Sequence, residues 1–237
     1  MNENLYYHLT GLFSNKLRSS LKKFFFNYFA SNELDIKLEK YLNYDRGYFV
    51  ELGANDGINQ SNTFYFEKKR RWSGVLIEPF KINYLECKKN RSKKNKFFCT
   101  ACVANNKIKK LKLLYANLMT TSTHNKKNLE KIKKYKIHGD KRSSKKYFYA
   151  EAKTLNEILN LAKSPKIIDL LSLDVEGSEL NVLKGINYKS YLFKYMLIEC
   201  NDYNKIVNFL KTKNYFVVNY FGKNDYLFKH RNITNKK

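Results

Sequence analysis

The chain has 237 residues, 43% hydrophobic and 16% aromatic, which suits one packed domain and excludes an intrinsically disordered chain. Its 46 lysines and arginines against 21 acidic residues give a formal net charge of +25, yet only seven of the basic residues are arginines. Nucleic-acid readers depend on arginine, so we do not expect a nucleic-acid partner. Without a long apolar run or a secretory signal, we expect a cytoplasmic protein.

Residues 1–45 precede the main pattern and are predicted to form a helical extension. Apolar side chains recur every three or four residues over 13–29, beside several lysines, which is typical of a basic amphipathic helix. This helix either packs on the rest of the protein or makes a peripheral contact with an anionic membrane, such as the inner membrane face. A second short helix is predicted over about 32–42.

From residue 48 onward, apolar strand-like runs alternate with helical stretches. Strands are predicted over 48–53, 74–79, 97–105, 168–177 and 195–200, and helices over 61–70, 82–90, 154–162, 178–186 and 203–214. Two further strands within 215–230 flank a Gly-Lys-Asn-Asp turn. The alternation predicts an α/β domain over 46–230, followed by a tail over 231–237. Its sheet is expected to be doubly wound and mostly parallel, with an antiparallel C-terminal hairpin.

A strongly basic insertion, residues 107–146, interrupts this alternation. It holds fourteen basic and two acidic residues. Segments 111–117 and 145–152 are predicted to pair with each other as a small unit outside the main sheet. The stretch between them is either a lid or binding loop, or a solvated basic loop. His124, within it, is a candidate substrate-binding residue and base.

Ligands of open α/β sheets bind outside the C-terminal ends of the strands, so the residues there are the candidate site. Gly53 and Gly57 follow the first strand and allow a tight turn. The dinucleotide fingerprint GxGxxG is absent, because Asn55 stands at its second glycine. Glu78 ends the second strand, about twenty residues after this loop, where a carboxylate accepts ribose hydroxyls. The pattern indicates a nucleoside ligand without a pyrophosphate.

A third motif, Leu-Asp-Val-Glu-Gly-Ser-Glu at 173–179, leaves the predicted fourth strand of the sheet. If the backbone is extended, Asp174 and Glu176 project to the same side. Either carboxylate is a candidate general base for a hydroxyl group. Two alternatives stay open: the pair holds a divalent cation, or the residues are structural, with Glu179 at a helix N-terminus and Asp174 anchoring the Gly53 loop.

Several segments together resemble the FkbM family of S-adenosylmethionine-dependent methyltransferases. They are YFVELGANDGINQSNTFYFEKKRRWSGVLIEPF, FFCTACVAN, IDLLSLDVEGSELNVLKGI and YMLIEC, and the resemblance runs from about residue 47 to 226. It implies a Rossmann-like class I methyltransferase fold, with the first-strand loop around the methionine moiety and Glu78 on the ribose. It also implies that Cys102 and Val103 lie near the adenine. The basic 107–146 segment departs from the family pattern.

The acidic residues agree with this cofactor, because S-adenosylmethionine carries a sulfonium and an ammonium cation. Six of the 21 acidic residues lie in the three strand-end motifs, where they would attract cations and repel a pyrophosphate. The predicted cofactor-binding residues are Glu51, Gly53, Asn55, Asp56, Gly57, Ser61, Asn62, Glu78, Cys102 and Val103. Asp174 and Glu176 are the predicted catalytic residues, and Glu179, Glu199 and His124 the predicted substrate-binding residues. No metal ligand is assigned.

The leading hypothesis is therefore O-methylation of a hydroxyl group with S-adenosyl-L-methionine. The resemblance implies a small-molecule or glycan acceptor: a sugar, a glycolipid or polysaccharide precursor, or a secondary metabolite. One alternative keeps the fold but makes RNA the acceptor, because lysine suits non-specific phosphate binding. The other is a membrane-surface interaction protein without catalysis, in which residues 13–29 and 107–146 bind the partner.

Overall fold

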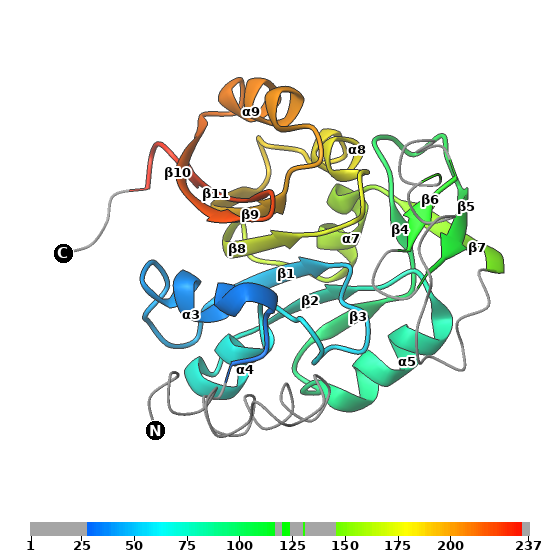
Figure 1. The fold of residues 1–237 in the computed structure, drawn as a ribbon, viewed down its shortest axis with the longest axis horizontal. Helices are drawn as coiled ribbons and strands as arrows, with labels where there is room; N and C mark the ends of the chain where they lie inside the picture. The colour runs from blue at the N-terminus through cyan, green and yellow to red at the C-terminus, as the bar shows by residue number, and fades with distance from the viewer. Residues whose placement is uncertain (1–27, 117–119, 124–129, 131–145, 234–237) are drawn as a thin grey trace.

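The computed structural model describes residues 28–116, 120–123, 130 and 146–233 (Figure 1). Its main sheet has seven strands, in the spatial order β10-β11-β9-β8-β1-β2-β3. In chain order they are β1 (Tyr48–Leu52), β2 (Ser73–Ile77), β3 (Lys96–Phe98), β8 (Ile167–Leu173), β9 (Leu192–Glu199), β10 (Tyr215–Gly222) and β11 (Asp225–His230).

The pairing within this sheet is parallel except at the C-terminal hairpin. β1 pairs in parallel with β2 and with β8, and β8 pairs in parallel with β9. β11 runs antiparallel to both β9 and β10. The turn between β10 and β11 therefore lies at the edge where the parallel strands end. The predicted mostly parallel sheet with its antiparallel hairpin is confirmed.

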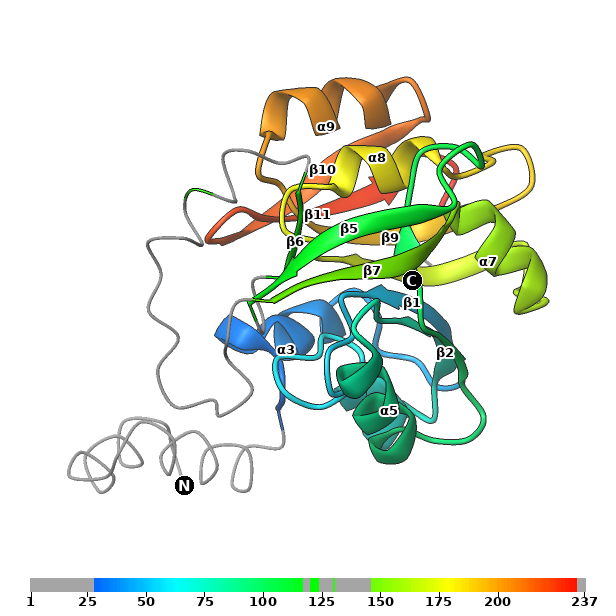
Figure 2. The same ribbon diagram turned by 90° about the vertical axis from the view of Figure 1, so that its right-hand side faces the viewer.

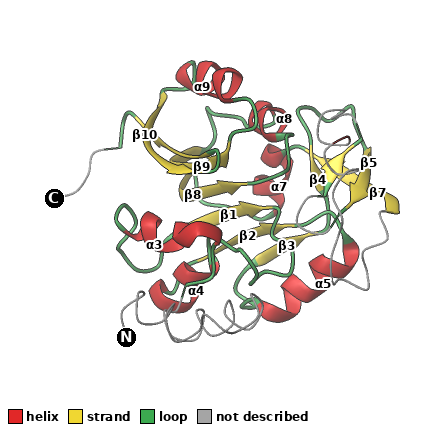
Figure 3. Ribbon diagram, viewed as in Figure 1, coloured by secondary structure: helices red, strands yellow, loops and turns green. Residues whose placement is uncertain are grey.

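Helices cover both faces of the main sheet (Figure 3). One face carries α3 (Leu34–Glu39), α4 (Phe64–Arg70) and α5 (Lys81–Asn90); the other carries α7 (Leu155–Leu161), α8 (Glu179–Lys184) and α9 (Tyr203–Lys211). Alternate strand residues supply the two cores. Phe49 of β1 is buried with the first set of helices, and its neighbour Val50 with the second. This two-sided burial explains why the strands are nearly continuous apolar runs.

A second, smaller sheet lies across the edge where the parallel strands end (Figures 1 and 2). Its order is β4 (Ala101–Cys102), β7 (Lys146–Lys153), β5 (Lys110–Tyr115) and β6 (Thr121–Ser122). β5 and β7 pair antiparallel, with Leu111 opposite Ala150. The predicted pairing of 111–117 with 145–152 is thereby confirmed.

The single strand predicted over 97–105 is wrong, because the segment divides into β3 of the main sheet and β4 of the second sheet. The Thr100 hydroxyl, at the bend, donates to the carbonyl oxygen of Glu151 at 2.8 Å. Just beyond β4, the Val103 amide donates to the carbonyl oxygen of Lys153 at 3.1 Å. Bonds to β7 thus replace those that a continued strand would make in the main sheet.

The N-terminal segment that the structure describes begins with a short 3-10 turn, η1 (Ser31–Glu33), followed by α3. The helix predicted over 32–42 is therefore present but shorter. The predicted helix over 13–29 lies outside the described residues except at its last two positions. Among the described helices, none is long and apolar enough to cross a membrane.

Candidate active site

A cavity of about 350 Å³ opens where the parallel strands of the main sheet end. The loops after β1, β2 and β8, the end of β9, and both β5 and β6 of the second sheet contribute to its lining. Nine of the predicted site residues line it: Gly53, Asn55, Ser61, Asn62, Glu78, Cys102, Asp174, Glu176 and Glu199. Residues that follow different parallel strands thus meet in one cavity, although their motifs are more than a hundred residues apart in the sequence.

The loop after β1 lies directly against the loop after β8. Gly53 has a φ of +78°, and a side chain there would overlap the carbonyl oxygen of Asp174. Asn55, with a φ of +46°, turns the chain back so that its amide donates to Glu78 at 2.9 Å. Glycine at 53 is therefore required both by the backbone conformation and by the close approach.

Glu78, at the end of β2, is buried at the cavity wall. One carboxylate oxygen accepts from the Asn55 amide and the other from the Phe80 amide, each at 2.9 Å. Burial raises the pKa of Glu78 to about 7, although the two amide bonds oppose the rise. Because each oxygen has a second lone pair, the carboxylate has capacity for two more donors, such as a pair of ribose hydroxyls.

Glu51 does not line the cavity; it holds the loop from behind. Its carboxylate accepts from the Ser61 hydroxyl at 3.0 Å, the Asn62 amide at 2.9 Å and the Thr63 hydroxyl at 2.7 Å. Arg91 completes the arrangement with a buried ion pair to Glu51 at 3.2 Å. Arg91 was not predicted, because a lone arginine at the end of a helix carries no signal of a partner forty residues away.

Other predicted residues also lie outside the cavity lining. Asp56 accepts from the amides of Ile58 and Asn59, which shapes the turn, and Gly57 packs with a φ of +82° against α5. Val103 is buried in the second sheet. Glu179 opens α8 as expected and accepts from the Gly177 amide at 2.7 Å. His124 lies outside the described residues.

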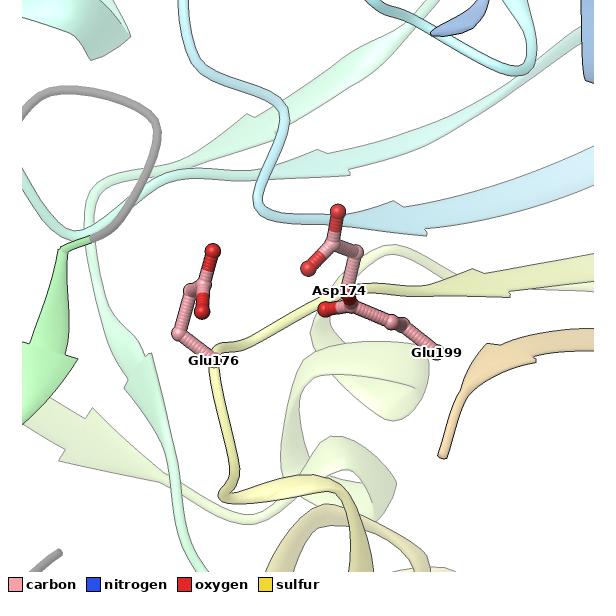
Figure 4. A group of neighbouring side chains, drawn as sticks. All are labelled: Asp174, Glu176 and Glu199. Atoms are coloured by element: carbon pink, nitrogen blue, oxygen red, sulfur yellow. The ribbon is translucent and has the colours of Figure 1, made fainter. Parts of the chain in front are cut away.

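Three carboxylates converge in the cavity: Asp174 and Glu176 from the loop after β8, and Glu199 from the end of β9 (Figure 4). One oxygen from each lies within 4.8 Å of the others. Asp174 is exposed to solvent where it lines the cavity. The protein atoms around its carboxyl group nevertheless displace water, and this desolvation raises its pKa well above the ordinary value. The charges of Glu199 and Glu176, and a hydrogen bond to Glu199, add to the rise.

The extended backbone assumed for Asp174 and Glu176 is wrong. β8 ends at Leu173, and Glu176 has a φ of +52°. The Glu176 carbonyl oxygen accepts from the buried Thr121 hydroxyl of β6 at 2.8 Å. A turn fastened by the second sheet, and not strand alternation, therefore places the two carboxylates together.

Sequence reasoning missed two charged residues at the hairpin turn, Lys223 and Asp225, which also line the cavity. Asp225 begins β11 directly opposite Glu199. Burial, and then the charge of Glu199, raises the pKa of Asp225 to about 7. The sequence could have predicted the place of Asp225, because a reversed final strand must begin at the edge where the parallel strands end.

The N-terminal segment supplies a further part of the lining that was not predicted. Ser31, Asn32 and Leu34 border the cavity, although they precede the first strand. The N-terminal extension is thus part of the candidate site.

A seven-stranded sheet with a reversed final strand, and a carboxylate-lined cavity where its parallel strands end, defines the class I methyltransferase type. The family model for the methyltransferase FkbM domain matches residues 51–228, so the chain belongs to the FkbM methyltransferase family. No curated protein matches the chain. Among solved structures, a methyltransferase from Geobacter sulfurreducens shares 12% identity over 98% of this chain and 96% of that one, with a TM-score of 0.46.

Proposed function

We propose that this methyltransferase uses S-adenosyl-L-methionine to methylate a hydroxyl group of a sugar, a glycolipid or polysaccharide precursor, or a secondary metabolite. The observation that carries the proposal is the charge of the cavity. Glu78, Asp174, Glu176, Glu199 and Asp225 all line it, in a chain whose net charge is +25. A cavity so rich in carboxylates suits a ligand with a sulfonium and an ammonium group.

The residues present fit this cofactor. The Asn62 side-chain oxygen is buried in the cavity wall without a hydrogen-bond partner, while its nitrogen donates to the Ser172 hydroxyl at 3.0 Å. An unpartnered buried acceptor is costly, so this oxygen is suited to receive a hydrogen bond from an ammonium group. Glu78 would hold the ribose. A volume of about 350 Å³ lies within the range of small-molecule sites.

The carboxylates that face the cavity supply the acid–base chemistry. S-adenosylmethionine, when bound, provides an electrophilic methyl group. The acceptor oxygen must lose its proton as it attacks, and Asp174 or Glu176 would accept that proton. A raised pKa makes Asp174 a stronger base once it is ionised, so its share in accepting the proton should grow as the pH rises. A base so placed contributes roughly 10²–10⁴-fold to the rate, and alignment of the acceptor contributes the rest.

Asp174, Glu176 and Glu199 are also the residues that would hold a divalent cation, because Mg²⁺ and Ca²⁺ prefer carboxylate oxygens. Such an ion would lower the pKa of the acceptor hydroxyl. Without an ion, the carboxylates themselves would take up the proton, which is their direct role. Methyl transfer that survives dialysis against EDTA would support the direct role of the carboxylates. Activity that is lost on dialysis and restored by Mg²⁺ would support a bound ion.

Calorimetry with S-adenosylhomocysteine tests the cofactor. The wild-type chain should bind it, and Glu78→Gln should raise the Kd about tenfold or more, because hydrogen bonds to a charged acceptor are worth about 1.5–3 kcal/mol. Glu151→Gln is the matched control, since Glu151 is exposed on β7 away from the cavity. Wild-type protein that does not bind S-adenosylhomocysteine would overturn the proposal.

A further inference from the structure

The N-terminal segment Ala30–Leu34, which we call the N-terminal wall, closes one side of the candidate site. Ser31, Asn32 and Leu34 line the cavity, yet all three lie before residue 51, where the match to the family domain begins. The wall therefore lies outside the part of the chain that the family model matches.

The wall spans two parts of the site. At one end Ala30 forms a parallel bridge with Gln60, two residues before Asn62, whose side-chain oxygen is proposed to accept from the ammonium group of the cofactor. At the other end α3 approaches the β10–β11 turn, where the positive charge of Lys37 partly offsets the rise in the pKa of Asp225. Asn59, Gln60, Lys223 and Asp225 all line the cavity. The wall thus lies between the loop after β1 and the β10–β11 turn.

A fully buried carboxylate fastens the wall. Asp35 is 0% exposed, and its side chain accepts from the amides of Phe29 at 2.7 Å, Ala30 at 3.2 Å and Ile36 at 3.0 Å. These bonds fold the chain back around Asn32 and Glu33, whose φ values are +51° and +60°. Asparagine tolerates this left-handed conformation, but it is unfavourable for glutamate. The Phe29 ring packs edge-on against Phe64 of α4, with ring centroids 4.6 Å apart.

We propose that Asp35 is a positioning residue that holds the N-terminal wall closed over the bound cofactor. This inference rests on the proposed function. The strained backbone supports it, because strain of this kind persists only where surrounding contacts enforce it, and it is concentrated at ligand sites. A closed wall slows the escape of ligand, so the effect belongs in the dissociation rate.

The experiment measures dissociation of S-adenosylhomocysteine from the full-length chain by surface plasmon resonance. Asp35→Ala should raise the dissociation rate about tenfold, as expected for the loss of one hydrogen bond to a charged group. Asn32→Gly is the second variant: glycine accepts the left-handed backbone, so the protein stays folded while the wall loses a side chain. Asn32→Gly should also raise the dissociation rate, by roughly several-fold, which is similar in size to the effect of Asp35→Ala.

Asp169→Ala is the matched control. Asp169 is another buried aspartate, bonded to the Tyr44 hydroxyl at 2.6 Å, the Tyr48 amide at 2.7 Å and Lys194 at 2.7 Å. It lies near the start of β8, away from the cavity. Its loss should lower the melting temperature as Asp35→Ala does, but leave the dissociation rate within about twofold of wild type.

The outcomes separate the wall from the proposed function. In the wild-type chain, hydrogen exchange at residues 29–36 should slow when S-adenosylhomocysteine binds. If wild type binds but neither variant dissociates faster, or if Asp169→Ala has the same effect, the wall proposal is overturned and the cofactor assignment stands. If wild type does not bind at all, the cofactor assignment fails and the wall proposal fails with it.

Discussion

At the scale of single residues, the site depends on the close approach of the loops after β1 and β8. Gly53 touches the backbone of Asp174 and leaves no room for a side chain, and Asn55 donates its amide to Glu78. The residue that would hold ribose and the residue that would accept a proton are therefore linked through one short stretch of backbone. A small shift of this stretch moves both.

Gly53→Ala should destabilise the protein more than Gly222→Ala. Both glycines have positive φ values, +78° and +93°, so each alanine carries about 1–3 kcal/mol of backbone strain. Only at Gly53 does the new methyl group meet another atom, which adds about 1–3 kcal/mol of overpacking. Urea unfolding of both variants measures the difference. Equal losses of stability in the two variants would show that the loop after β1 does not contact the loop after β8.

At the scale of elements, one buried arginine joins three of them. Arg91 follows α5, pairs with Glu51 of β1 and with Glu67 of α4, and donates to the Gly57 carbonyl at 3.1 Å. Its guanidinium also lies over the rings of Phe49 and Phe64. The loop after β1 is thus held from behind by a charge network that never enters the cavity.

Arg91→Met should lower the free energy of unfolding by about 3–5 kcal/mol, because it leaves the carboxylates of Glu51 and Glu67 buried without their counter-charge. Arg70→Met is the comparison. Arg70 pairs with Glu39 at 2.6 Å, but these side chains are 31% and 26% exposed, so the loss should stay below about 1 kcal/mol. Chemical denaturation measures the free energy of unfolding of both variants. A loss at Arg91→Met as small as that at Arg70→Met would mean that the buried charge network adds little to stability.

The sequence predicted the elements of the main sheet well because their apolar runs are continuous, as in the 48–53 strand, and because turns and helices follow at regular intervals. It did not predict the division at Thr100, since the bonds that end β3 come from β7, fifty residues later. For the same reason Arg91 and the N-terminal wall were missed: each depends on a contact distant in sequence. Asp225 could have been found from the hairpin topology alone.

At the scale of the whole molecule, a strongly basic chain encloses an acidic cavity. The positive charge lies outside the cavity: Lys223 is the one basic side chain among the described residues that line it. This separation supports a cationic ligand inside and leaves the lysines of the surface to solvent or to weak anionic contacts. A steep dependence of RNA affinity on salt would measure such contacts without bearing on the cavity.

The buried carboxylates should give the free protein an unusual dependence of stability on pH. Burial raises the pKa of Glu78, Glu179 and Asp225 to about 7, above the values near 4 of the unfolded chain. Between these limits the folded state binds more protons than the unfolded state, so its stability falls as the pH rises from about 4 to about 7.

Urea unfolding at constant ionic strength should therefore give a higher free energy of unfolding at pH 5.5 than at pH 8. Asp225→Asn should reduce this difference, because asparagine does not ionise. A wild-type chain that is more stable at pH 8, or an Asp225→Asn variant with an unchanged pH dependence, would contradict the raised pKa values.

The carboxylate-lined cavity at the ends of the parallel strands is proposed to bind an adenosyl sulfonium compound. A crystal structure of the complex with S-adenosylhomocysteine tests it most directly. In that complex the ribose hydroxyls should lie on Glu78, the amino group at the Asn62 side-chain oxygen, and the sulfur atom should face Asp174, Glu176 and Glu199. Density for the ligand outside this cavity, or an adenosyl group that does not reach Glu78, would contradict it.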